Sequence, residues 1–211
     1  MKVLLVEGNE DKRVIPQLVE AAGILWAPNR TQIVDIVPFD GVDALLKPGE
    51  IETQLKRSRL TALGVLVDAD ESASGRWDSI RARIVEHYPN APTIMPPPGV
   101  VLRSAGKPSF GAWVMPDNVN RGMLETFLMY LRPQGNQPLL DLSADIVSTA
   151  KSLGAPFSER HVDKAQIHSW LAWQEPPGRQ LHNAIMEKML TNQPRHLHAF
   201  IAWFRDLFAI Q

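Results

Sequence analysis

Three carboxylic acids follow short apolar segments of this 211-residue chain. Glu7 comes directly after residues 3–6, and Asp68 and Asp70 stand two residues apart after residues 62–67. Side chains at positions i and i+2 of an extended chain point to the same side, so we expect these two aspartates to leave the sheet together. Carboxylate oxygens are the ligands that Mg²⁺ and Mn²⁺ prefer. Two such ions can activate a water molecule and stabilise the leaving oxygen in phosphodiester hydrolysis.

The segments around these acids predict strands that alternate with helices. Strands are predicted at residues 3–6, 31–38 and 62–67, and helices at residues 10–22, 45–60 and 77–88. Asn9 is the predicted N-cap of the first helix, and Pro48 divides the second helix into two pieces. Such alternation implies right-handed crossovers and a parallel sheet. Because ligands bind beyond the carboxyl ends of parallel strands, we expect Glu7 at the same edge as Asp68 and Asp70.

The second half of the chain predicts a change from α/β to helical structure. Five prolines fall within residues 89–98, which predicts a loop. Two short strands are then predicted at residues 100–102 and 112–115, where they could pair as a hairpin. Only helices are predicted after them, at residues 121–131, 139–153, 163–173, 179–190 and 196–208. The composition changes near residues 131–137. The sequence therefore predicts an α/β domain over residues 1–132 and a helical C-terminal extension over residues 133–211 that packs on it.

Composition restricts the class of protein. Hydrophobic residues make up 45% of the chain, which is enough for a packed core, and the formal net charge of −1 offers no general attraction to nucleic acid. Cysteine is absent, which excludes disulfides, thiolate metal sites and cysteine nucleophiles. No apolar run is long enough for a signal peptide or a membrane span. These features predict a cytoplasmic protein without a membrane partner.

Two short motifs resemble a known family. Glu7-Gly8 closing one predicted strand and Asp68-Ala69-Asp70 closing another look like the Toprim signature. Topoisomerases, bacterial primases and the overcoming-lysogenization-defect nucleases share this domain, and the resemblance covers about residues 1–130. The sequences WVMPDN at 113–118, GMLETFL at 122–128 and KAQIHSWLA at 164–172, with Pro177-Gly178, resemble a stand-alone Toprim-like family of unknown function.

The resemblance implies a set of site residues. In the overcoming-lysogenization-defect nucleases the similar site uses a glutamate, an acid one helical turn later, an Asp-x-Asp pair, a further glutamate and a lysine. The matching residues here are Glu7, Asp11, Asp68, Asp70, Glu125 and Lys164. The first five are the expected ligands of two Mg²⁺ or Mn²⁺ ions, and Lys164 would stabilise charge on the phosphoryl oxygens. The implied activity is metal-dependent cleavage of DNA or RNA by a Toprim-like fold.

Partners follow from the same comparison. Arg103, Lys107 and Arg121 stand in predicted loops that we expect to flank the acidic edge, where they would bind substrate phosphates. The chain has no Gly-x-x-x-x-Gly-Lys-Ser/Thr motif, so the ATPase that accompanies Toprim in that nuclease class would be a separate chain. Such two-component pairs are known in anti-phage defence. A homo-oligomer is also compatible with the sequence.

Two other interpretations stay open. Residues 67–72, VDADES, resemble the aspartyl nucleophile motif of haloacid-dehalogenase phosphatases. In that family the motif lies on the first strand, whereas here two predicted strands precede it and Glu7 would have no role. The other alternative is an adaptor without catalysis, in which a Toprim-like domain binds an ATPase partner.

Overall fold

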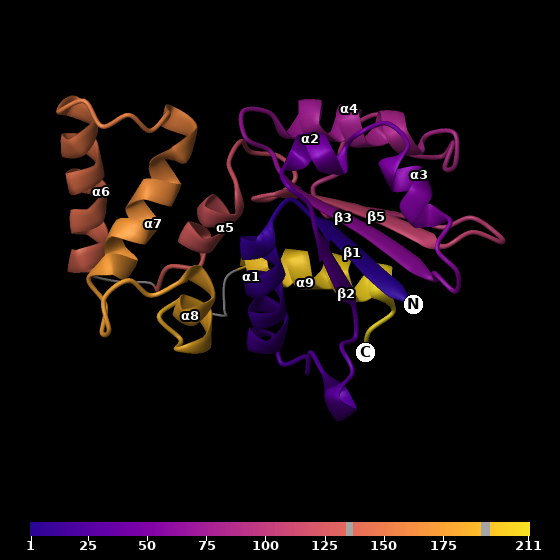
Figure 1. Cartoon of the computed structure of the whole chain (residues 1–211), viewed down its shortest axis with the longest axis horizontal. Coiled ribbons are helices and arrows are strands. Elements are labelled where there is room, and N and C mark those ends of the chain that lie inside the picture. Colours follow the sequence, from indigo (N-terminus) through magenta and orange to yellow (C-terminus); the bar gives the residue numbers. More distant parts are fainter. Residues whose placement is uncertain (134–136, 191–194) are drawn as a thin grey trace.

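The computed structural model describes residues 1–133, 137–190 and 195–211. A five-stranded sheet with the order β2-β1-β3-β5-β4 forms its centre (Figure 1). The strands are β1 (Lys2–Val6), β2 (Asp35–Pro38), β3 (Ala62–Asp68), β4 (Val100–Leu102) and β5 (Ser109–Met115). The first four of this order are parallel, and β4 pairs antiparallel with β5. The predicted α/β fold with a parallel sheet flanked by helices is confirmed.

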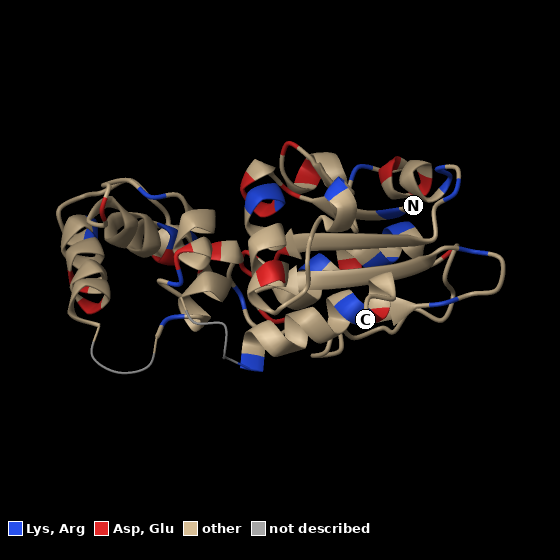
Figure 2. Cartoon of the chain, turned by 90° about the horizontal axis from the view of Figure 1, so that it is seen from below, with Lys and Arg blue, Asp and Glu red and all other residues tan. Residues whose placement is uncertain are grey.

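The register of the sheet places the acids at one edge. Val6 pairs with Leu66, and Asp68 pairs with Met115, so the parallel strands end almost level. Glu7 directly follows β1 and Asp68 ends β3. Figures 1 and 2, viewed at right angles to each other, both show a pair of helices standing apart from the sheet, beyond this edge.

Helices flank both faces of the sheet. The α-helices are α1 (Asn9–Ala21), α2 (Val42–Leu45), α3 (Glu50–Leu55), α4 (Ala73–Ile84), α5 (Leu124–Tyr130), α6 (Pro138–Ser152), α7 (Val162–Ala172), α8 (Leu181–Met186) and α9 (Arg195–Phe208). Two 3₁₀ helices are η1 (Pro28–Arg30) and η2 (Glu159–His161). The break between α2 and α3 confirms that Pro48 interrupts the predicted helix. Among the described residues, none of the helices is long and apolar enough to cross a membrane.

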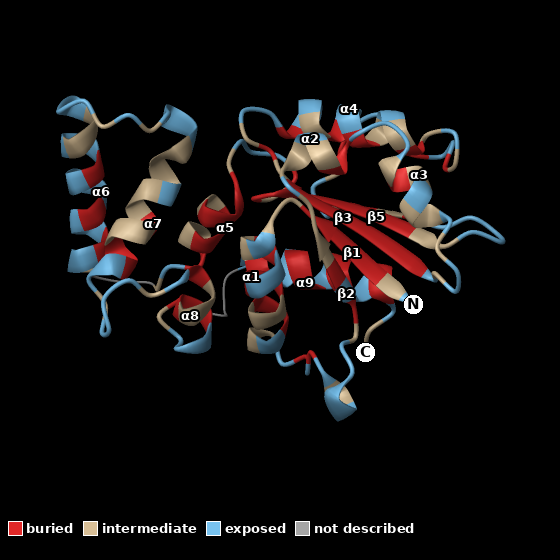
Figure 3. Ribbon diagram, viewed as in Figure 1, coloured by how far each residue is buried: buried red, intermediate tan, exposed pale blue. Residues whose placement is uncertain are grey.

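Two apolar cores enclose the sheet, whose strands β1, β3 and β5 are almost entirely buried (Figure 3). One core joins Leu4 and Trp113 of the sheet to α1, α5 and α9, with Phe200 and Phe204 among its largest buried side chains. The other joins the opposite sheet face to α3 and α4. Side chains alternate between the two cores along each strand, as expected for a sheet buried on both faces.

The last helix lies directly on the sheet. A Cβ atom at Gly111 would lie 2.5 Å from Leu207 Cδ2, and one at Gly64 would lie 3.0 Å from Phe208 Cζ, both in α9. Glycine at these two paired positions therefore lets α9 approach β3 and β5 closely. Although α9 belongs to the predicted C-terminal extension, it completes a core of the sheet, and the division at residue 132 stays a prediction.

We call α6, η2 and α7 the helical arm.

Candidate functional site

Three elements meet at the carboxyl edge of the sheet. The Asp68 backbone N–H donates to Glu7 Oε1 over 2.8 Å, which ties the end of β3 to the residue after β1. The Leu124 N–H, at the start of α5, donates to Asp68 Oδ1 over 2.9 Å. The carboxylates of Glu7 and Asp68 are therefore each oriented by a backbone N–H group from a different element.

Two further acids are buried beside them. Asp11, in the first turn of α1, is 7% exposed and Glu125, in the first turn of α5, is 3% exposed. Carboxylates are favoured in the first turn of a helix by the helix dipole. The Asn9 cap predicted from sequence is wrong: Gly8 is the N-cap, and its N–H donates to Asp11 Oδ2 over 3.0 Å.

Burial and mutual repulsion oppose ionisation in this group. Burial is the main cause that raises the pKa of Glu7, and the backbone bond from Asp68 partly opposes it. Burial and the charges of Glu7 and Glu125 raise the pKa of Asp11 to about 7. Burial and the charges of Asp11, Glu7 and Glu125 raise the pKa of Asp68 well above its ordinary value. We call Glu7, Asp11, Asp68 and Glu125 the carboxylate cluster.

A lysine from the helical arm reaches the carboxylate cluster. Lys164 Nζ, on α7, lies 2.9 Å from Glu125 Oε1. The lysine side chain is 48% exposed, whereas that of Glu125 is 4% exposed. Burial lowers the pKa of Lys164, but the hydrogen bond to Glu125 and the charges of Glu125 and Asp68 outweigh it, and the net shift is upward. Lys164 therefore remains a cation at the edge of the cluster.

Asp70 lies at the same edge in a different conformation from that predicted. The strand ends at Asp68, and Asp70 has a left-handed φ of 50°. The expectation that both aspartates project from one extended strand is therefore wrong. Arg76 Nη2 lies 2.8 Å from Asp70 Oδ2. Sequence reasoning missed Arg76, although it stands in the helix that follows the Asp-x-Asp motif.

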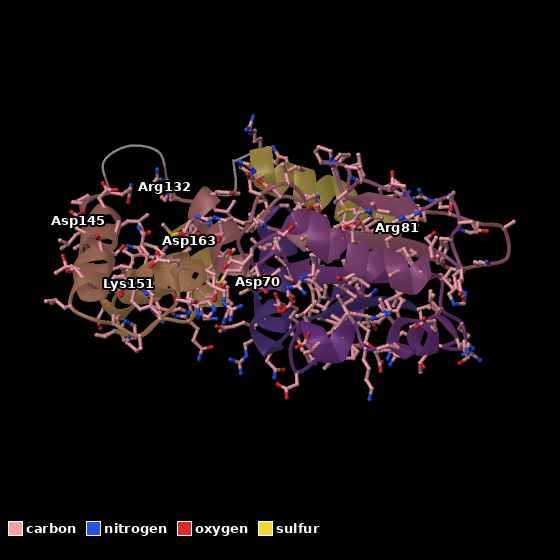
Figure 4. All side chains as sticks on the ribbon, turned by 90° about the horizontal axis from the view of Figure 1, so that it is seen from above. Asp70, Arg81, Arg132, Asp145, Lys151 and Asp163 are labelled. Atoms are coloured by element: carbon pink, nitrogen blue, oxygen red, sulfur yellow. The ribbon has the colours of Figure 1, made fainter. Side chains whose placement is uncertain are left out.

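A pocket of about 360 Å³ opens over these residues. Its walls come from both the sheet edge and the helical arm; the lining includes Glu7, Asp40, Asp43, Asp68, Asp70, Met123, Arg160, His161 and Lys164. Figure 4 shows Asp70 where the arm meets the α/β part of the molecule. The sequence carries no local signal for the arm residues Arg160 and His161, because they lie about ninety positions after Asp70 in the chain.

Of the three basic residues predicted to bind substrate phosphates, two lie at the amino edge of the sheet and one lies near the acids at the carboxyl edge. Arg103 follows β4, forms an ion pair of 2.8 Å with Asp206, and lies at the amino edge because β4 runs antiparallel. Lys107 precedes β5 at that same edge and donates to the His87 carbonyl. Their predicted placement beside the acids is wrong. Arg121 lies as expected, in a second pocket of about 280 Å³ that Asp70 also lines.

The donor set suits a hard divalent cation. The cluster presents carboxylate oxygens, the ligand type of Mg²⁺ and Mn²⁺, from buried positions where their negative charge lacks full compensation. In the part of the chain that the structure describes, no three acidic or histidine side chains are yet arranged as a metal site. Binding of a cation by three of these side chains would therefore require them to move.

The chain was compared with solved structures, with curated proteins and with models of protein families. The C-terminal region of the OLD protein of Burkholderia pseudomallei is similar over 98% of this chain and 98% of that chain, with 13% identity and a TM-score of 0.42. The C-terminal region of the Xanthomonas campestris pv. campestris OLD protein is similar over 99% and 96%, with 13% identity and a TM-score of 0.40. The search of curated proteins found no match. The family model described as "protein of unknown function (DUF3226)" matches residues 1–209, and the chain belongs to this family.

Proposed function

We propose that this protein is a Toprim-like nuclease that cleaves DNA or RNA with the help of a divalent cation. The observation that carries the proposal is the carboxylate cluster, in which burial, with added repulsion from neighbouring acids, raises the pKa of Glu7, Asp11 and Asp68. Acids with such shifts, gathered at the carboxyl edge of a parallel sheet, are typical of functional sites. The Toprim-like motifs of the sequence support the same interpretation.

The residues divide into two roles. Glu7, Asp11, Asp68 and Glu125 would hold Mg²⁺ or Mn²⁺, which when bound activates water and stabilises the leaving oxygen. Lys164, oriented by Glu125 over 2.9 Å, offers its ammonium group to the phosphoryl oxygens. Because Lys164 and Arg160 line the pocket opposite the sheet edge, the helical arm would contact the substrate backbone.

We further propose that an ATPase, where one takes part, acts as a separate chain, as in two-component anti-phage systems. The sequence has no phosphate-binding loop of its own. In that arrangement the present chain would supply the cleavage site, and the partner would control it.

Cleavage assays test the nuclease proposal. The purified protein is incubated with plasmid, single-stranded DNA and structured RNA in Mg²⁺, Mn²⁺ or EDTA. We expect cleavage that requires the metal, and the Asp68→Asn variant should lose on the order of 10²-fold or more in rate, the scale for removing one preorganised electrostatic group. Asparagine keeps an oxygen that can accept the Leu124 N–H, so the fold should survive.

A matched substitution serves as the control. Asp35 is exposed at the start of β2, on the opposite edge of the sheet, and Asp35→Asn should cleave like the unmodified protein. Equal cleavage by Asp68→Asn and the unmodified protein would contradict the proposal. If no substrate is cleaved while Mn²⁺ still raises the melting temperature, the adaptor interpretation is favoured instead.

A further inference from the structure

Arg76 contacts the two aspartates of the Asp-x-Asp motif at the acidic edge of the sheet. Its Nη2 atom lies 2.8 Å from Asp70 Oδ2, and its Nε donates over 2.8 Å to the Asp68 carbonyl oxygen. The two side chains of the ion pair are 17% and 26% exposed. A guanidinium group fixes its donors in one plane, so these two bonds together define where the Asp70 carboxylate lies.

The backbone fixes Asp70 from the other side. Its N–H donates to the Gly122 carbonyl and its carbonyl accepts from the Gly122 N–H, both over 2.9 Å. Gly122 has a φ of 134°, which favours glycine, and a Cβ there would lie 2.6 Å from Thr126 Oγ1. Asp70 is therefore part of a connection between the end of β3 and the start of α5, which are the segments that carry Asp68 and Glu125.

The other acids have different partners. Glu7, Asp11 and Asp68 each accept a backbone N–H. Among the described residues, no lysine or arginine forms an ion pair with these three acids. Asp70 alone of the Asp-x-Asp pair has a guanidinium counter-ion, and at Glu7 the charge of Arg76, which lowers the pKa, outweighs that of Asp70, which raises it. At Glu7, Asp11 and Asp68, by contrast, burial outweighs the favourable contacts and the net shift of the pKa is upward.

We propose that Arg76, in place of a second divalent cation, permanently neutralises Asp70, so that this edge binds one divalent cation through the carboxylate cluster. Asp70 and Arg76 are then positioning residues that hold Asp68 and the start of α5. This differs from the two ions and the Asp70 ligand expected from sequence. The single-cation part of the inference rests on the proposed function, whereas the ion pair does not.

Counting bound Mn²⁺ tests the stoichiometry. Titration of the full chain followed by electron paramagnetic resonance or calorimetry should give one ion per chain. The Asp70→Asn variant should still bind one ion with a dissociation constant within about threefold of the unmodified protein. Asp68→Asn should weaken binding by more than about 100-fold, beyond the loss for a residue that only supports a ligand. Two ions in the unmodified protein, or equal losses in both variants, would overturn the inference.

Thermal unfolding of four proteins tests the ion pair itself, in EDTA and in Mn²⁺. They are the unmodified chain, Asp70→Asn, Arg76→Gln and the double variant. Each single variant should melt lower, and the double variant should fall by less than the sum of the two losses, equally in EDTA and Mn²⁺. Additive losses, or non-additivity that disappears in Mn²⁺, would overturn the inference. Absence of Mn²⁺ binding with non-additive losses would refute the metal-dependent function and leave the ion pair standing.

Discussion

At the scale of single residues, the carboxylate cluster makes stability depend on pH. The pKa of Asp11 rises from an ordinary 3.8 to about 7 in the folded protein, mainly through burial. A raised pKa means that the folded state binds more protons than the unfolded state between these values. The stabilising contribution is full below about pH 4 and is lost as the pH rises through 7. The free energy of unfolding should fall by roughly 1.4 kcal/mol per pH unit for each proton involved.

Melting temperatures in EDTA between pH 5 and pH 8 measure this effect. The unmodified chain should melt progressively lower as the pH rises, and Asp11→Asn should show a shallower slope because its amide does not ionise. Asp35→Asn, at the opposite edge, is the control and should keep the original slope. A slope in Asp11→Asn as steep as that of the unmodified chain would count against a buried, proton-binding Asp11.

Substitution of Lys164 should lower the cleavage rate without weakening metal binding. Its ammonium group contacts Glu125 and lines the pocket, so Lys164→Met should lower the cleavage rate on the order of 10²-fold. Mn²⁺ affinity should stay equal or become tighter, because the substitution removes a positive charge beside the carboxylates. Rates and Mn²⁺ dissociation constants are compared with those of Lys107→Met, at the amino edge. Loss of Mn²⁺ binding in Lys164→Met would show that the lysine maintains the cluster instead.

At the scale of elements, the position of α9 depends on glycine in the sheet. A methyl group at Gly111 would meet Leu207, so Gly111→Ala should lower the free energy of unfolding by about 1–3 kcal/mol, the usual cost of overpacking. Denaturant titration measures the change. Combining Gly111→Ala with Leu207→Ala should cost less than the sum of the two single substitutions, since the second opens space for the first. Additive costs would mean that α9 does not press on β5.

At the scale of the whole molecule, a bound cation should stabilise the fold. A ligand that binds only the folded state adds about 2.7 kcal/mol at one hundred times its dissociation constant. For a chain of this size, each kcal/mol corresponds to a melting-temperature increase of roughly 2–4 °C. Thermal unfolding with increasing Mn²⁺ measures this shift, which Asp68→Asn should abolish. An identical shift in Asp68→Asn would place the bound ion elsewhere.

The sequence by itself determined the α/β fold and the edge where the acids lie. Short apolar runs that alternate with helical patterns indicate strands of a covered parallel sheet, and parallel strands end at a common edge. The prediction that Glu7 and Asp68 lie together therefore needed no tertiary information. The helices of the second half were also predicted, because their apolar residues recur at helical spacing. The sequence motifs also predicted a stand-alone family of unknown function, and the DUF3226 family model matches residues 1–209, whereas the Toprim relationship stays a prediction.

Only the tertiary structure decided which charges meet. The family resemblance placed Lys164 and Glu125 in one site, but only the structure shows that they form an ion pair across 39 positions of the chain. It also shows that Arg76 pairs with Asp70 and that Arg103 lies at the opposite edge beside Asp206. Local patterns fix the direction of each strand and helix, but long-range ion pairs depend on how those elements pack. The left-handed turn at Asp70 arises from pairing with Gly122, a contact that no local pattern predicts. Burial, which raises the pKa of Asp11 and Asp68, likewise exists only once α1, β3 and α5 have come together.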